Sequence, residues 1–383
     1  MPKRRVETAV SMVVDRNFPA SSVVEATKLI QSSGAADYMM MWDQLTSWIP
    51  PCLWTPENTP QANLWDVDSF SDWNVMGAYG VSQAPGLGMS ISMDAVRRGP
   101  PELIQTMLSV ANITEGKAIY QLGGGEIKQT EPFGYRRAEG LTRLEEFYKL
   151  FHKFWESDKP IDFEGKYWKM KQATLGKAKR YRPQIWGLGG GPRIIDLATS
   201  YADGFASSIP LVWATPEQAA EQIKAMKEQL EKKGRDPEKF SFGAWAMVLA
   251  HEDMDLIKRS MSNPLIAWNA LHFGRLIMSD WRKEGLEPPM PDDWHYALKL
   301  LPTEVTKEQA MEWLSRLTPA HSEKSWFYGT PKDIAGRIQP YIEAGVNWVV
   351  PVDMLAMVLQ PEDAAKSLIR CIEIARIVKQ NNS

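Results

Sequence analysis

Short apolar runs alternate with amphipathic segments along the whole chain. Eight of these runs have the length and composition of strands, and they lie at 8–14, 36–42, 87–93, 117–122, 183–188, 204–207, 240–249 and 348–352. The clearest helix is expected at 139–155, where Leu144, Tyr148, Phe151 and Trp155 recur at three- and four-residue spacing. Because strands that alternate with helices form parallel sheets, and open sheets usually have fewer strands, the pattern predicts a (β/α)8 TIM barrel. We expect residues 1–383 to form a single barrel domain.

Two long stretches interrupt this alternation, one after the second strand, at 43–75, and one after the seventh, at about 250–325. Both are rich in large aromatic residues, which are Trp48, Trp54, Trp65 and Trp73 in the first and Trp268, Phe273, Trp281 and Trp294 in the second. In a TIM barrel the loops that follow the strands meet at one end of the barrel. Both insertions are therefore expected at the barrel mouth.

Composition and charge narrow the possible partners. The net charge is −3, from 44 basic and 47 acidic residues, so no long-range field favours nucleic acid or an anionic membrane. The cysteines Cys52 and Cys371 are far apart and have no metal-ligand spacing, so we expect neither a disulfide framework nor a metal site. The chain has no apolar run of about 18 residues and no secretory signal, which predicts a cytoplasmic protein without a membrane span.

Polar or glycine-rich residues stand at the ends of four predicted strands, at Asp43-Gln44, Ser90-Ile91, Gly123 to Glu126 and Gly189 to Arg193. Active sites of TIM barrels are built at these strand ends. Glycines let a planar ligand approach the backbone, and free N–H groups at a helix start bind phosphate. One ligand with a planar redox ring and a phosphate tail would use all four segments. The constellation therefore favours a flavin-type cofactor.

Each of these segments also has a structural explanation. Asp43 could cap a turn, Ser90 could be a buried hydroxyl bonded to the backbone, and Glu126 could be an exposed loop residue. The glycines at 189–191 could form an ordinary turn before Pro192. From the residues alone these interpretations stay open.

Several of these motifs resemble the bacterial luciferase-like family, and within it the branch that uses the deazaflavin coenzyme F420. Residues 43–48 resemble its Asp-His-x-x-x-Trp stretch, 87–91 its Leu-Gly-Thr-Ser-Val strand, and 123–126 its Gly-x-Gly-Glu. Residues 189–204 and, near the C-terminus, 329–331 with 344–346 are similar to its glycine signatures. The Glu-Pro-Phe-Gly stretch at 131–134 is shared with the mycobacterial phthiodiolone dimycocerosate ketoreductases of this branch.

The resemblance implies roles for residues at matching positions. Asp43, Ser90 and Ile91 would contact the deazaflavin ring, with a non-prolyl cis peptide between the last two. The glycines at the other strand ends, which include Gly124, would border the ring, and Gly190, Gly191 and Arg193 would border the cofactor phosphate. Trp48 and Glu126 would face the substrate, with Glu126 as proton donor or acceptor.

One position departs from the family motif. Gln44 stands where the family has histidine, and an amide cannot shuttle a proton. Gln44 can still hydrogen-bond a substrate oxygen, which leaves Glu126 as the obvious titrating group.

The resemblance implies an F420-dependent oxidoreductase that transfers a hydride to or from a carbonyl, an alcohol or an activated alkene. The insertion after the seventh strand resembles a lid, and its aromatic residues suit a small apolar substrate, such as a lipid or polyketide-like ketone. Packing within the loops, or the interface of a homodimer, explains the same residues equally well. The alternatives are an FMN-dependent luciferase-like monooxygenase and a non-catalytic flavin-binding protein.

Overall fold

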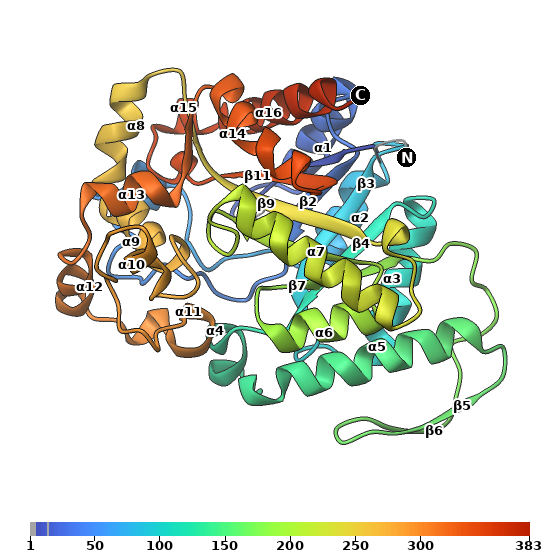
Figure 1. Ribbon diagram of the computed structural model, residues 1–383. Helices are drawn as coiled ribbons and strands as arrows, with labels where there is room; N and C mark the ends of the chain where they lie inside the picture. The colour runs from blue at the N-terminus through green and yellow to red at the C-terminus, as the bar shows by residue number, and fades with distance from the viewer. Residues whose placement is uncertain (1–4, 14) are drawn as a thin grey trace.

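The structure is a computed structural model, and it describes residues 5–13 and 15–383. Its core is a closed barrel of eight parallel strands (Figure 1). In barrel order these are β1 (Glu7–Ser11), β2 (Tyr38–Trp42), β3 (Gly88–Asp94), β4 (Ala118–Gly123), β7 (Gln184–Leu188), β8 (Gly204–Ile209), β9 (Ser241–Ala250) and β11 (Trp348–Asp353). The barrel closes because β1 pairs with both β2 and β11, and β9 with both β8 and β11. The predicted fold and all eight predicted strands are confirmed, although position 14 of the first predicted strand lies outside the described residues.

The strands read as continuous apolar runs because both of their faces are buried. In β2 every residue of Tyr-Met-Met-Met-Trp is buried. Alternate residues fill the barrel interior, where Met40, Trp186 and Trp348 belong to one apolar cluster. The residues between them, such as Met39 and Ile91, pack outward against the helices. Parallel sheets covered on both faces have this composition.

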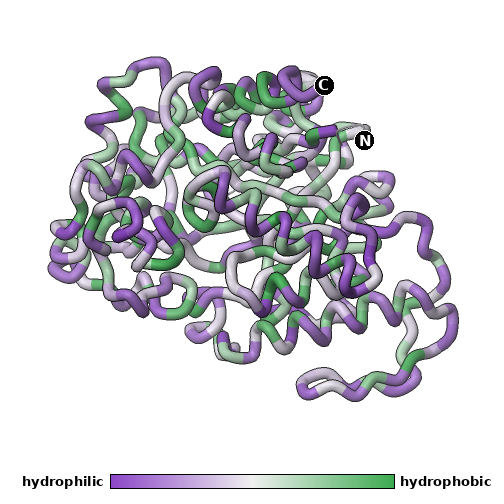
Figure 2. Tube along the Cα trace, in the orientation of Figure 1, coloured by the Kyte–Doolittle hydropathy of each residue, from purple (hydrophilic) through white to green (hydrophobic). Residues whose placement is uncertain are grey.

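The helices that cover the barrel lie where the periodicity predicts them. They are α1 (Ser21–Ser33), α3 (Pro100–Ile113), α5 (Gly140–Glu156), α6 (Pro192–Tyr201), α7 (Pro216–Lys232), α14 (Pro331–Glu343) and α16 (Ser367–Asn381). Figure 2 shows hydrophobic and hydrophilic residues alternating along α5, which buries one stripe on the barrel. The segment after the last strand is divided into two helices, since α15 (Pro361–Ala364) ends before α16 begins.

The antiparallel hairpin of β5 (Ile161–Glu164) and β6 (Lys169–Ala173) was not predicted, and it projects from the barrel (Figure 1). Its strands are short and mostly exposed, so they carry no hydrophobic pattern. They depend on the buried carboxylate of Glu146, which accepts hydrogen bonds from the backbone N–H groups of residues 166–168 at 2.6–3.1 Å. A short strand, β10 (Phe327–Gly329), also pairs with β9.

The two insertions pack together over one end of the barrel. The first runs from Asp43 to α2 (Trp73–Val81). The second carries α8 (Met254–Met261), α9 (Pro264–Phe273), α10 (Asp280–Lys283), α11 (Tyr296–Lys299), α12 (Lys307–Leu314) and α13 (Pro319–Ser325), which gather at the left of Figure 1. One apolar cluster joins Ile49 and Leu53 of the first insertion to Trp268 and Trp281 of the second. The insertions therefore cover the carboxyl ends of the strands, as expected.

Loop packing accounts for most of the tryptophans in these insertions. Trp268 and Trp281 are fully buried, and Trp54 and Trp65 pack with ring centroids 4.6 Å apart. Trp48 is the exception, because it also lines a cavity. In the described part of the chain, no helix combines the length and apolar composition that crossing a membrane requires. The expected homodimer stays a prediction.

Candidate active site

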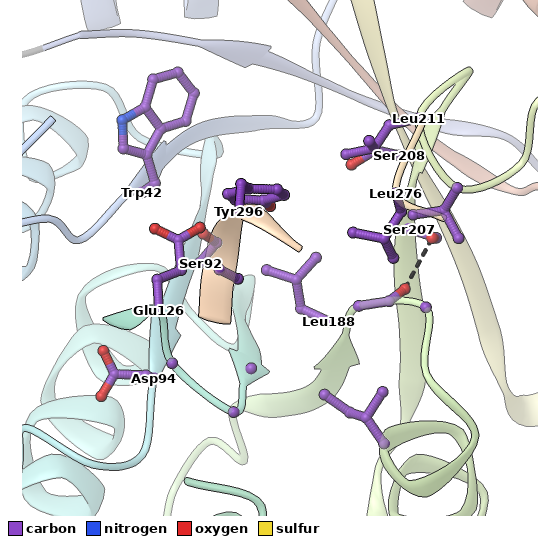
Figure 3. A pocket seen from close by; sticks show the side chains of 18 of the residues that line it. Trp42, Ser92, Asp94, Glu126, Leu188, Ser207, Ser208, Leu211, Leu276 and Tyr296 are labelled. Atoms are coloured by element: carbon purple, nitrogen blue, oxygen red, sulfur yellow. Dashed lines mark hydrogen bonds between the residues drawn. The ribbon is translucent and has the colours of Figure 1, made fainter. Parts of the chain in front are cut away.

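A cavity of about 460 Å³ opens at the carboxyl ends of β2, β3, β4 and β7, beneath the second insertion (Figure 3). Most of the residues proposed from the sequence line it, namely Asp43, Gln44, Trp48, Gly124, Glu126, Gly190, Gly191 and Arg193. Residues more than 140 positions apart in the chain thus meet at one place. The barrel rule, that active sites lie at strand ends, explains why they do.

Ser90 and Ile91 do not line the cavity, and this corrects the role expected for them. Ser90 is fully buried inside the barrel, where its hydroxyl accepts a hydrogen bond from Gln121 Nε2 at 3.1 Å, and Ile91 packs outward. The expected cis peptide between them is also wrong, since within the described residues the cis bond is Ile209–Pro210. Strand residues alternate in direction, so the position that reaches the cavity on the side of Ser90 is Ser92, two residues further on.

Asp43 is held by two arginines that follow β3. Its carboxylate is 5% exposed and lies 3.3 Å from both Arg97 and Arg98. Arg97 also pairs with Asp94 at 2.5 Å. Burial opposes the charge on Arg97, but Asp94 and Asp43 raise its pKa above the ordinary value. These ion pairs fix the Asp43 carboxylate at the cavity wall.

Glu126 forms an ion pair with Lys128, a residue that the sequence did not single out. The Lys128 ammonium is 2.9 Å from Glu126 Oε2 and donates to the carbonyl of Thr46 at 3.0 Å. Lys128 is 2% exposed, whereas Glu126 is 28% exposed toward the cavity. Burial lowers the pKa of Lys128, and the charge of Glu126 opposes this shift. The pair therefore holds the Glu126 side chain at the mouth of the barrel.

The short helix α4 (Ile127–Thr130), which follows Glu126, fastens the segment after β2. Gln129 accepts a hydrogen bond from the N–H of Leu45 at 2.7 Å and donates to the Thr46 carbonyl at 2.8 Å. This contact fixes the backbone next to Gln44, whose buried Oε1 has no hydrogen-bond partner in the described chain. Trp48 is held from the other side, because its indole N–H donates to Asn269 of α9.

Three more cavity residues were missed, and they are Arg137, His295 and Tyr296. Figure 3 shows the Tyr296 ring in the cavity close to Glu126. Burial and the positive charge of Arg137 lower the pKa of His295, while Glu126 raises it. No strand end or periodic pattern marks these residues in the sequence. By contrast, Asp94 and Arg97 directly follow a predicted strand, and the barrel rule could have found them.

The glycine turn after β7 leaves its backbone accessible. Gly189 has φ of +151°, a conformation that favours glycine. A side chain at Gly191 would meet no atom within 4 Å, so this position faces open space. Helix α6 begins at the next residue, and Arg193 bonds to Thr142 at 3.0 Å beside it. Free N–H groups and a nearby guanidinium suit an anionic group at this edge of the cavity.

The fold and this site agree with the family that the chain matches. Residues 53–347 match the family model described as luciferase-like monooxygenase, so the chain belongs to the luciferase-like family. The expected membership is confirmed.

Two kinds of relatives stand out. The phthiodiolone/phenolphthiodiolone dimycocerosates ketoreductase of Mycobacterium kansasii is 25% identical over 342 residues, covering 87% of this chain and 90% of that protein. Among solved structures, an F420-dependent secondary alcohol dehydrogenase with an F420–acetone adduct has a TM-score of 0.70 and 15% identity, covering 98% and 99% of the two chains. Riboflavin lyase with modified FMN has a TM-score of 0.65 and 14% identity, covering 99% and 93%. These structural similarities concern the fold alone.

Proposed function

We propose that this protein is an F420-dependent oxidoreductase that transfers a hydride between the deazaflavin and an apolar carbonyl, alcohol or activated alkene. The observation that carries the proposal is the cavity itself, which is lined together by Glu126, by the glycine loops after β4 and β7, and by large apolar side chains. The relatives named as a ketoreductase and as an F420-dependent dehydrogenase support the same chemistry.

The polar atoms of the cavity fit a planar cofactor with hydrogen-bonding edges. Four buried polar atoms at its wall have no hydrogen-bond partner in another described residue, and they are Trp42 Nε1, Gln44 Oε1, Arg137 Nε and His295 Nδ1. Buried polar groups are normally satisfied, so a bound ring with carbonyl and N–H groups would complete this wall. A deazaflavin bound there would supply a carbon that accepts or releases hydride.

The chain's own residues would hold such a cofactor at two places. Ser92 and the glycines 123–125 would border the ring, and Asp43, held in place by Arg97, would lie beside it. Gly190, Gly191 and Arg193 would bind the phosphate of the tail.

The apolar part of the cavity lining favours an apolar substrate. It includes Trp48, Met247, Phe273 and Leu276, which come from both insertions and from β9. Glu126 is the group to which we assign proton exchange with the substrate, directly or through a neighbour. Gln44 would hydrogen-bond the substrate oxygen.

Cofactor binding tests the proposal directly. Titration of the purified protein with F420 and with FMN, followed by fluorescence, should give saturable binding of F420 and much weaker binding of FMN. Gly191→Ala should weaken F420 binding at least fivefold, because its methyl group enters the open space beside the turn. Gly336→Ala, which also meets no atom within 4 Å but lies on the remote helix α14, is the matched control.

Two outcomes would overturn the proposal. Tight FMN binding without F420 binding would favour an FMN-dependent monooxygenase; two solved structures with a similar fold are named as monooxygenases. F420 binding without turnover of any ketone, secondary alcohol or activated alkene would favour a flavin-binding protein without catalysis. With an active substrate in hand, unchanged turnover in Glu126→Gln would exclude Glu126 from proton exchange.

A further inference from the structure

The second insertion contributes a histidine, His295, to the lining of the cavity. His295 directly precedes α11, and α11 packs against α4, the helix that follows Glu126. Both His295 and Glu126 line the same cavity, although 169 positions separate them. Gln44, which stands where the family motif has histidine, lines this cavity as well. A titrating imidazole thus lines the cavity, but it comes from the second insertion and not from the motif after β2.

The surroundings of His295 leave its ring available for a ligand. Its Nδ1 is buried and makes no hydrogen bond to another described residue. The ring stacks on Tyr296, with centroids 5.7 Å apart and planes inclined by 20°, so its orientation is set by packing. An imidazole with unused hydrogen-bonding capacity at a cavity wall can exchange a proton with a bound molecule.

The charged groups around His295 come from two elements. Glu126 at the start of α4 is negative and favours the imidazolium, while Arg137, before α5, disfavours it. Lys128 lies behind Glu126 and is paired with it, and Tyr296 is the other titratable neighbour. Burial adds to the effect of Arg137, so the pKa of His295 lies below its ordinary value and the ring is neutral near pH 7.

We propose that His295 is the catalytic residue that exchanges the proton of the substrate oxygen, and that Glu126 stabilises the resulting imidazolium. This inference rests on the proposed function. In alcohol oxidation the O–H proton would move to the imidazole as the C=O bond forms, and a deazaflavin bound in the cavity would supply the acceptor for the C–H hydride with its two electrons. Carbonyl reduction is the reverse, with imidazolium as the proton donor. His295 therefore performs the task for which Gln44 is unsuited.

The first test uses the cofactor-free protein, so it does not depend on which cofactor binds. Histidine NMR titration, with His295 assigned by the His295→Gln variant, should show a pKa below the ordinary value for His295. Glu126→Gln should lower it further by at least half a unit, and Arg137→Met should raise it. His152, which lies near Glu156 on the outer side of α5, is the internal control and should not move. A pKa of His295 that neither variant changes would overturn the proposed coupling.

The second test is kinetic and uses the cofactor-loaded protein with a secondary alcohol. His295→Ala should lower kcat at least a hundredfold with KM changed less than threefold, as for loss of a general base. The wild-type rate should rise with pH through a pKa below 6.5, and this limb should vanish in His295→Gln. Added imidazole should restore activity to His295→Ala but not to Glu126→Ala. An unchanged pH profile, or no rescue in a folded variant, would contradict the role of His295.

The two proposals fail in different ways. If NMR shows the coupling but F420 does not bind, the proposed function is wrong and His295 serves another ligand. If F420 binds and turns over in His295→Gln at the wild-type rate, the proposed function stands and the role of His295 is wrong.

Discussion

At the scale of single residues, Glu126 and Lys128 form an ion pair whose two members differ in their exposure to solvent. Lys128 is almost fully buried, while Glu126 faces the cavity. An ion that loses its partner lowers the free energy of unfolding more when it is buried than when water can solvate it. The two residues should therefore tolerate substitution very differently.

Glu126→Gln should lower the free energy of unfolding by about 3 kcal/mol, because it leaves the Lys128 ammonium buried without a counter-charge. Lys128→Met should cost less than about 1 kcal/mol, since Met fills the buried space and Glu126 can still be solvated. The double variant should resemble Lys128→Met. Urea denaturation of the four proteins measures the coupling, and additive effects would show that the pair does not interact. The double variant also provides a folded control for activity measurements.

His272 should make stability depend on pH. It is fully buried in the second insertion, and burial lowers its pKa to about 3. The unfolded chain binds its proton near pH 6.5, and the folded protein does not. His272 therefore does not reduce the free energy of unfolding above pH 6.5. Below that pH it lowers this free energy by about 1.4 kcal/mol for each unit by which the pH decreases.

His272→Gln should remove this dependence, because an amide keeps a hydrogen-bond acceptor for Trp294 but does not titrate. Between pH 6.5 and 5 the wild type should lose about 2 kcal/mol more than the variant. Since both proteins share all other titrating groups, the difference isolates His272. If the free energy of unfolding changed with pH equally in the two proteins, His272 would be protonated in the folded state as easily as in the unfolded chain.

At the scale of elements, the hairpin β5–β6 depends on one side chain from another element. The Glu146 carboxylate of α5 accepts three backbone N–H groups at the hairpin turn. Bonds of this kind, to a charged acceptor, are about twice as strong as neutral ones. Most side chains of the two hairpin strands are not buried, so few other contacts stabilise the hairpin.

Glu146→Gln should loosen the hairpin without unfolding the barrel, because the amide nitrogen cannot accept and the charge is lost. Hydrogen exchange of residues 161–173 should accelerate at least tenfold, which corresponds to about 1.4 kcal/mol. Exchange in β4 and β7 should stay unchanged. Glu145→Gln, which removes ion pairs with Lys149 and Arg193 but no bond to the hairpin, is the matched control and should leave the hairpin protected.

At the scale of the whole molecule, the insertions and the barrel share their apolar interior. Met247 of β9 and Val352 of β11 belong to the same cluster as Trp48 and Trp268. A segment that shares its core with the barrel cannot unfold alone without exposing barrel side chains. This packing favours one cooperative unit for the described residues, 5–13 and 15–383.

Calorimetry should therefore show a single unfolding transition for the full chain, with equal calorimetric and van't Hoff enthalpies. Near-ultraviolet circular dichroism, dominated by the tryptophans of the insertions, should change at the same temperature as the far-ultraviolet signal of the barrel. An earlier separate transition in the tryptophan signal would show that the insertions form an independent unit.

Much of the site could be predicted because strand ends are local features. Asp43, Glu126 and Gly191 each follow an apolar run, and a closed barrel brings all such positions to one rim. The role predicted for Ser90 was wrong because Ser90 lies in the middle of β3 and not at its end, and the alternation along β3 decides that Ser92 reaches the cavity. Lys128 and Arg137 could not be predicted, since their burial depends on contacts between segments.

The sequence alone determined the barrel, its eight strands and the family, because these depend on periodicity and on short motifs. Only the tertiary structure decided which titrating groups face one another. His295 enters the cavity because α11 packs on α4, a contact between segments about 170 positions apart with no local signature. Apolar patterns record what each segment buries, whereas the partners of a buried charge are set by how the segments assemble.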